Sequence, residues 1–346
     1  MRWRITIALV ISILVMAWST FAQMPTFSQY YASAMYLSPA LTGLEKDVYM
    51  GMNYRSQWSG AGIPFSTFQF SFISPVLKRG THTKHLGGLG ATFYNDVAGP
   101  GKEFKNNALM FSGAYNFHLT RFGNNLVSVG MQAGAMQQRV NADDMRWASQ
   151  YSPDVGYDGS RPGEAGSINS QVFNPILNTG VMWSYTTRGR LSTRSFSAFN
   201  GIVVSNLLPM RSYTGEAEPD MMLFKLHGGF SSIWKRTLEI SPNYLIQYQN
   251  HAYEVNVGAY FSYYLEPPFL ESSQRTKVMI GGWYRIQDAV ILSAGISTRS
   301  WNFGFSYDNN VSSLTRAFGY ANAYEVSLAY KIIVSKGFKR FSSPLI

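Results

Sequence analysis

The sequence contains no cysteine and, after its first 22 residues, no long hydrophobic run. The absence of cysteine excludes a disulfide framework, and it also excludes a lipid anchor on a cysteine behind a signal peptide. A membrane-spanning helix needs about 18 or more consecutive apolar residues, whereas a membrane-spanning β-strand needs only about 9 to 11. Spanning by helices is therefore excluded for the mature chain, and spanning by strands is not.

Recognisable catalytic and metal-binding motifs are also missing. No H-E-x-x-H, G-x-S-x-G or phosphate-loop pattern occurs. The histidines do not follow a metal-ligand spacing; they are His82, His85, His118, His227 and His251. We therefore expect no enzyme activity, no cofactor and no metal site. A rarer alternative is an outer-membrane enzyme whose Ser, His and Asp residues converge from different strands.

The formal net charge of +10 comes from basic residues spread along the chain. Nucleic-acid binding would require clustered Lys and Arg with stacking aromatic residues. Basic residues instead fall in turns, such as Lys78-Arg79, and in the tail at 336–340. Solvated turns and contacts with lipid headgroups explain them, and no nucleic-acid partner is expected.

The first 22 residues have the pattern of a secretory signal peptide. Arg2 and Arg4 precede an apolar run from Ile5 to Ala17, and small residues end at Ala22. This order predicts export and cleavage after Ala22. In a Gram-negative bacterium, an exported chain that spans by strands belongs in the outer membrane.

Apolar and polar residues alternate at period two over most of the chain. In Tyr324–Ile332, for example, every second residue is apolar, and the residues between include Glu325, Ser327 and Lys331. Alternation gives a strand one apolar and one polar face, as a barrel between lipid and a wet lumen requires. We expect an all-β fold, a transmembrane antiparallel outer-membrane β-barrel of about 14 strands. The strands are expected at 47–57, 66–77, 85–95, 106–119, 125–140, 175–187, 195–206, 223–233, 237–249, 253–264, 276–286, 289–297, 300–308 and 323–333.

Connections between these strands differ in length. The long ones are 141–174, 207–222, 266–276 and 309–322, and we expect them on the extracellular side, with the short turns opposite. The loop 141–174 carries Asp143, Asp144, Asp154 and Asp158. Calcium binding there is conceivable, but the spacing matches no calcium loop, so a solvated loop is favoured. Asn95-Asp96 and Tyr307-Asp308 fall at expected strand ends, where they would close turns.

Outside the barrel at 47–334, two segments lack a regular period. Residues 335–346 form a C-terminal tail. Residues 23–46 are rich in aromatic residues and carry Pro25 and Pro39. We expect this N-terminal segment, called the strap below, to pack at the periplasmic mouth of the barrel or to plug its lumen.

Several short patches, in order along the chain, resemble the PorP/SprF-type membrane proteins of the Bacteroidetes type IX secretion system. The patches are Gln23–Tyr30 (QMPTFSQY), Leu37–Gly43 (LSPALTG), Met52–Trp58 (MNYRSQW), Gly88–Gly90, Asn95-Asp96, Gly130–Gln138 (GMQAGAMQQ), Asp144–Trp147 (DMRW), Ser306–Asp308 and Glu325–Tyr330. The resemblance implies a noncatalytic barrel that binds a large secreted adhesin through its C-terminal domain and supports its export or surface anchoring. It also implies other secretion or gliding components as partners, including periplasmic lipoproteins.

Residues for partner binding or for plugging the lumen come from the first three patches. They are Phe27, Ser28, Gln29, Tyr30, Pro39, Ala40, Asn53, Arg55, Gln57 and Trp58. A purely structural role, sealing the periplasmic end of the barrel, is the alternative for Phe27, Tyr30 and Trp58. For the whole chain, the alternative function is a diffusion channel or a transporter of hydrophobic solutes.

Overall fold

The computed structural model describes residues 26–62, 64–78, 84–120, 125–142, 145–152, 154–163, 171–187, 195–212, 217–218, 221–235, 237–266, 275–312 and 322–334. The expected signal peptide, 1–22, and the expected tail, 335–346, lie outside the described residues. The same is true of Asp143 and Asp144.

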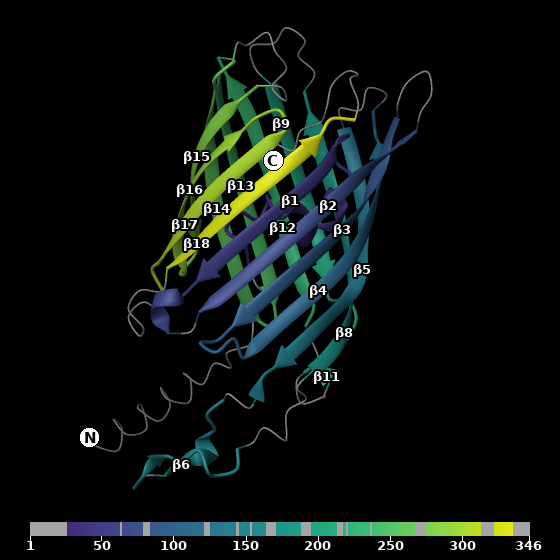
Figure 1. Ribbon diagram of the computed structural model, residues 1–346. Helices are drawn as coiled ribbons and strands as arrows, with labels where there is room; N and C mark the ends of the chain where they lie inside the picture. The colour runs from purple at the N-terminus through teal and green to yellow at the C-terminus, as the bar shows by residue number, and fades with distance from the viewer. Residues whose placement is uncertain are drawn as a thin grey trace, which may run out of the picture.

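Fourteen antiparallel strands close into a barrel, in the ring order β1-β18-β17-β16-β15-β14-β13-β12-β9-β8-β5-β4-β3-β2 (Figure 1). The fold class and the strand number expected from the alternation are confirmed. The strands are β1 (Val48–Gln57), β2 (Phe65–Lys78), β3 (Lys84–Ala98), β4 (Phe104–His118), β5 (Asn125–Val140), β8 (Gln171–Thr186), β9 (Ser195–Ser205), β12 (Leu223–Trp234), β13 (Leu238–Gln249), β14 (Ala252–Tyr264), β15 (Lys277–Arg285), β16 (Ala289–Ser297), β17 (Trp301–Asn310) and β18 (Ala323–Ile332).

The alternation in sequence becomes an inside and an outside of the barrel wall. In β18, Tyr324 is 42% exposed on the outer face, while its neighbour Glu325 is fully buried in the lumen. Outward residues of β17 are Phe303, Phe305 and Tyr307, which suit contact with lipid. The polar residues therefore gather inside, where they can contact one another across the lumen.

Both ends of the barrel wall meet at one rim. Val48 at the start of β1 pairs with Ile332 at the end of β18, so the first and last strands are hydrogen-bonded neighbours. We call this end the terminal rim and the opposite end the loop rim. Two small sheets lie in connections that leave from the loop rim: β6 (Tyr151–Ser152) with β7 (Gly156–Tyr157), and β10 (Met210–Arg211) with β11 (Ala217–Glu218).

The expectation that the four long connections share one side is wrong for 266–276. Because successive strands run in opposite directions, connections alternate between the two rims. The connections β5–β8, β9–β12 and β17–β18 leave from the loop rim, but β14–β15, which contains 266–276, leaves from the terminal rim. The short turns at Asn250-His251 and Gln287-Asp288 lie at the loop rim, so loop length does not separate the two sides.

The β5–β8 connection forms a small folded unit that extends beyond the loop rim, at the bottom of Figure 1. It contains a 3-10 turn, η4 (Ala148–Gln150), and the guanidinium of Arg146 lies 4.8 Å from the centroid of the Tyr157 ring. Hydrogen bonds from Ser160 lower the pKa of Asp158. Among the described residues, no group of three or more His, Cys, Asp or Glu side chains could hold a metal ion.

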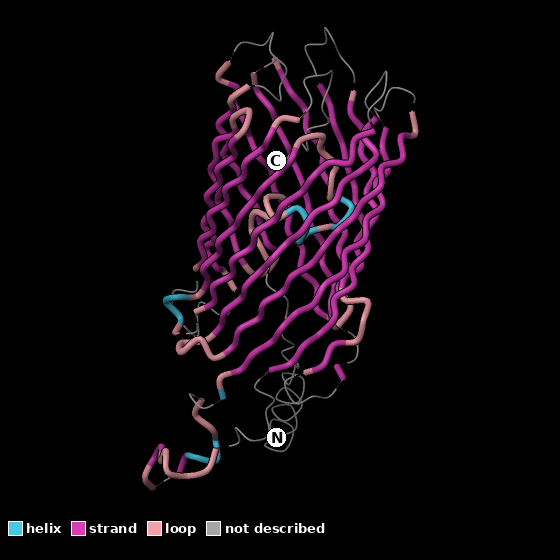
Figure 2. Tube along the Cα trace, turned by 45° about the vertical axis from the view of Figure 1, so that its right-hand side comes forward, coloured by secondary structure: helices cyan, strands magenta, loops and turns pink. Residues whose placement is uncertain are grey.

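Residues 26–46 of the strap run inside the barrel, where Figure 2 shows their helical turns in cyan between the walls. The turns are α2 (Ala34–Leu37) and the 3-10 helix η1 (Pro39–Leu41). Strap side chains such as Tyr30, Leu37 and Ala40 form a buried cluster with wall residues that include Phe199 and Trp283. No helix among the described residues is long and apolar enough to cross a membrane.

Candidate functional site: the strap and the lumen wall

The carboxylate of Glu325 holds the beginning of the strap. It accepts the main-chain N–H of Ser28 at 2.7 Å through one oxygen and that of Gln29 at 3.2 Å through the other. The Asn53 amide donates to the same carboxylate at 3.2 Å and to Ser33 Oγ at 2.7 Å. Because one carboxyl group accepts two consecutive main-chain N–H groups, it fixes the strap backbone at this point.

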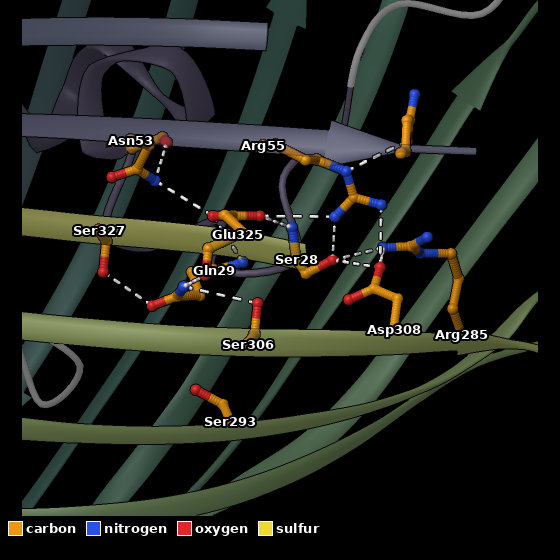
Figure 3. A network of polar contacts seen from close by, with 12 residues as sticks. Ser28, Gln29, Asn53, Arg55, Arg285, Ser293, Ser306, Asp308, Glu325 and Ser327 are labelled. Atoms are coloured by element: carbon orange, nitrogen blue, oxygen red, sulfur yellow. Dashed lines mark hydrogen bonds and ion pairs between the residues drawn. The ribbon is translucent and has the colours of Figure 1, made fainter. Parts of the chain in front are cut away.

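A network of charged wall residues surrounds the Ser28 hydroxyl (Figure 3). The hydroxyl donates to Asp308 Oδ2 at 2.6 Å and accepts from the guanidinium groups of Arg55 and Arg285. The two arginines also pair with Asp308 directly, at 2.9 Å and 3.4 Å. All the charged side chains in this network belong to the barrel wall. The strap contributes the neutral Ser28 hydroxyl, which contacts three of them.

The network lies at the seam where the barrel closes. Arg55 of β1 and Glu325 of β18 are direct cross-strand partners, and their side chains form an ion pair at 3.4 Å. Gln29 extends the contact to the neighbouring strands: its amide accepts from Ser327 of β18 at 2.8 Å and approaches Ser306 of β17 at 3.5 Å. The start of the strap therefore bridges the first strand and the last two.

The two adjacent tyrosines of the strap point to other strands. The Tyr30 hydroxyl donates to the Asn243 side-chain oxygen in β13, and the indole N–H of Trp283 donates to the same oxygen at 2.8 Å. The Tyr31 ring packs edge-on against Phe199, with centroids 5.4 Å apart. Burial raises the pKa of both tyrosines well above the usual value, so both hydroxyls are neutral donors.

Five wall side chains donate hydrogen bonds to main-chain carbonyl groups of the strap. The donors come from four strands, β1, β4, β5 and β12. The pairs are Tyr49 with Ala32 at 3.1 Å, Gln132 with Met35 at 3.3 Å, Lys225 with Tyr36 at 3.0 Å, Ser128 with Ala40 at 2.8 Å and Asn116 with Gly43 at 3.2 Å. Buried carbonyl groups that the short helical turns leave open thus find partners in the wall.

Wall glycines let the strap backbone approach the sheet closely. A Cβ added to Gly130 of β5 would lie 2.4 Å from the carbonyl carbon of Pro39. One added to Gly88 of β3 would lie 2.3 Å from the Cα of Gly43. Strands β5 and β8 stand about half-way round the ring from β17 and β18, so the strap spans the lumen from the seam to the far wall.

The structure brings half of the ten expected site residues together. Ser28, Gln29, Asn53 and Arg55 share the seam network, and Gln57 accepts from Arg55 Nε at 3.2 Å. The remaining five residues lie in three places. Phe27 and Tyr30 are buried strap residues on either side of Ser28 and Gln29, and Pro39 and Ala40 are strap residues that contact the far wall. Trp58 lies in the β1–β2 turn, with its ring 5.2 Å from that of Phe65.

Sequence reasoning missed the wall partners of the strap. The turn role expected for Asp308 is wrong, because β17 continues to Asn310 and the Asp308 carboxylate points into the lumen. Asp96 likewise lies within β3 and accepts from Thr67 at 2.6 Å. A usable signal was present: Asp308 and Glu325 are acidic residues on the inward faces of β17 and β18, where their neighbours Ser306 and Ser327 are small and uncharged.

We expect the replacement Arg55→Met to destabilise the barrel by about 3 to 5 kcal/mol, because it leaves the buried carboxylate of Glu325 without its ion-pair partner. Urea unfolding in detergent micelles, followed by tryptophan fluorescence, measures the loss. Adding Glu325→Gln should recover part of it, since the two residues are coupled. Arg139→Met, on the exposed outer face, serves as the control and should change stability by less than about 0.5 kcal/mol. Equal losses for the two arginines would contradict the role of the network.

A family model described as type IX secretion system membrane protein PorP/SprF matches residues 19–330. The comparison with curated proteins finds no match. Among solved structures, the toluene transporter TbuX of Ralstonia pickettii is 12% identical, covers 87% of this chain and 93% of its own, and has a TM-score of 0.46. A Pseudomonas aeruginosa FadL homologue is 11% identical over 86% and 94%, with a TM-score of 0.43.

The family match covers nearly the whole chain, and the closed barrel with outward aromatic residues places the protein in the outer membrane. A protein of a secretion system acts with the other components of that system. The chain belongs to the PorP/SprF family of type IX secretion system membrane proteins.

Proposed function

We propose that this protein is a noncatalytic partner barrel that binds a large secreted adhesin through its C-terminal domain and supports its export or surface anchoring. The observation that carries the proposal is the strap: residues 26–44 cross the lumen, and the wall holds them from the seam to β5. An open diffusion channel would be obstructed by such a segment. A barrel built to hold a protein at the surface needs only its wall and its loops.

The partner surface in this proposal is the folded unit of the β5–β8 connection. Its tip presents Val155, which is 76% exposed, beside the half-exposed rings of Tyr151 and Tyr157. Hydrogen bonds inside the unit fix this shape, including Asp158 N–H to the Gln150 carbonyl at 2.8 Å. A preorganised aromatic surface lowers the entropic cost of binding a protein. The unit would face the cell exterior if the terminal rim faces the periplasm, where type IX lipoproteins are available as further partners.

Affinity purification from the native outer membrane tests this function. A tagged protein is extracted in mild detergent, and co-purifying proteins are identified by mass spectrometry. We expect a large secreted protein, or its C-terminal domain, at close to one copy per barrel. A variant with the three tip residues Tyr151, Val155 and Tyr157 changed to Ser should lose the companion and keep the barrel. A pure barrel without a stoichiometric companion would contradict the proposal.

A channel or a transporter of hydrophobic solutes is the second candidate, and one observation favours it. A cavity of about 50 Å³ remains between the strap and the wall, lined by aromatic residues that include Tyr31, Tyr260 and Trp283. A small apolar solute would suit such a lining. Tryptophan quenching by toluene or a similar aromatic compound would detect it, and saturable quenching that Trp283→Leu abolishes would support this second function.

A further inference from the structure

The strap contacts the lumen wall as a bound peptide contacts its binding site, and it is not a strand of the barrel sheet. The fourteen strands pair with one another around the full ring, including β1 with β18, so the wall closes without the strap. Main-chain hydrogen bonds of the strap, such as Leu37 N–H to the Ser33 carbonyl and Ser38 N–H to the Ala34 carbonyl, join strap residues to each other. The strap and the sheet are therefore two separately bonded backbones.

The strap and the wall also differ in charge. Residues 26–44 contain no Asp, Glu, Lys, Arg or His. Four of the wall ions that touch them pair with one another, Arg55 with Asp308 and Glu325, and Arg285 with Asp308, whereas Lys225 donates to the Tyr36 carbonyl. Departure of the strap would expose the four paired ions to water while leaving each with a partner. A departing strap would also take no unpaired charge with it, so the largest electrostatic penalty for separating the two parts is absent.

The wall nevertheless recognises specific features of the strap. Glu325 accepts two consecutive main-chain N–H groups, and five side chains donate to carbonyl groups farther along. Asn243 accepts a tyrosine hydroxyl, and Gly130 leaves room only for a close backbone. Donors and acceptors that satisfy an extended or turning backbone, with an aromatic pocket beside them, are the parts of a peptide-binding site.

Residues 45–47 join the strap covalently to β1. At the terminal rim, Glu45 pairs with Lys331 at 3.1 Å, and Asp47 accepts from the main-chain N–H of Val334 at 3.1 Å. From there the strap descends to Ser28 near the far end of β1. Withdrawal is thus possible toward the terminal rim, without any movement of a strand.

We propose that the lumen is a preformed binding site for an uncharged peptide of about the strap's length, which the chain's own residues 26–44 occupy and can leave. A free peptide with the strap's sequence binds the same site in trans. The inference deepens the proposed function, because it concerns how the same lumen is closed, but its test involves no secreted partner. Loss of cargo binding and failure of peptide exchange can therefore be told apart.

The test uses the complete folded protein, so a folding defect cannot imitate the result. A protease recognition sequence is inserted after Lys46, the purified protein is cut there, and a fluorescent synthetic peptide of residues 26–44 is added. We expect saturable uptake of one peptide per barrel, seen as a rise in anisotropy, with release of the original strap detected by mass spectrometry. A peptide of the same composition in scrambled order should not bind.

Two variants of the cut protein sharpen the result. Glu325→Gln removes the carboxylate that accepts Ser28 and Gln29, and it should weaken peptide binding about tenfold or more. Glu239→Gln is the matched control, because this buried lumen carboxylate bonds with Ser231, Tyr264 and Lys277 and should leave the affinity unchanged. The proposal is overturned if the cut barrel retains its strap and takes up no peptide until it unfolds, or if the scrambled peptide binds equally well.

Discussion

Deletion of residues 23–43 should turn a silent barrel into an ion-conducting one. In planar bilayers, we expect no resolvable channel events for the complete protein and stable open steps for the deletion variant. A barrel of fourteen strands encloses more space than the side chains of its own wall can fill, and here strap residues such as Ser28 and Ala40 contact the wall on both sides of that space. With the strap gone, the lumen is lined by Arg55, Arg285, Glu325 and other polar residues, which favour water.

The control for this experiment is a second deletion of similar length elsewhere. Removal of residues 146–162 shortens the folded unit at the loop rim, outside the lumen, and should leave the bilayer silent. Heat-modifiable migration in gels verifies that both variants are folded barrels. Three results are distinguishable: an open, folded barrel supports closure by the strap; a folded barrel that stays silent contradicts it; and loss of the barrel itself assigns the strap a role in folding.

The same deletion separates lumen closure from partner binding. If the strap serves only to close the lumen, the open variant should still co-purify with its secreted partner through the loop rim. If residues such as Ser28 and Gln29 also dock the partner, the companion is lost while the barrel remains inserted. Conductance and co-purification of one variant thus assign the strap to closure, to docking or to both.

The strands could be predicted because their signal is local. Alternation at period two in Tyr324–Ile332 needs no knowledge of the neighbouring strand, and the structure places β18 at Ala323–Ile332. Because successive strands run in opposite directions, the position of a strand in the order then determines from which rim the next connection leaves. Loop length predicts the wrong side for 266–276, because strand direction decides from which rim a connection leaves.

The seam network could not be predicted because its signal is nonlocal. Ser28 meets Asp308 across 280 residues and Glu325 across 297. No spacing in the sequence predicts these contacts. They depend on closure of the barrel, which brings β1 beside β18. The resemblance to a family names Ser28, Gln29 and Arg55 as candidates, and the structure places them close together, whereas an acidic residue near an expected strand end, such as Asp308, has the pattern of a turn former.

Gly130→Leu should detach the strap from the far wall. The new Cβ would lie 2.4 Å from the carbonyl carbon and oxygen of Pro39 and 2.5 Å from the amide nitrogen of Ala40, so η1 must move. These are main-chain atoms of a closely packed turn, and they cannot yield by a change of rotamer. Overpacking of this kind costs about 1 to 3 kcal/mol or more, and the whole cost falls on the contact between strap and wall.

Because the protein has no cysteine, a single thiol can report the detachment. Ser38→Cys is nearly isosteric, and Ser38 is fully buried between η1 and the wall, so a maleimide should label it slowly in the otherwise native protein. With Gly130→Leu in addition, labelling should approach the rate of the unfolded protein. The matched control is Gly113→Leu in the adjacent strand β4, where the added Cβ meets only Leu89 Cδ2 at 3.4 Å on the outer face.

Slow labelling of the thiol in the Gly130→Leu variant would mean that the strap is not held by close backbone contact at this wall. Fast labelling in each of the two leucine variants would mean that the thiol reports the stability of the whole barrel. Fast labelling in the Gly130→Leu variant alone identifies Gly130 as the position where the wall lets the strap backbone approach closely.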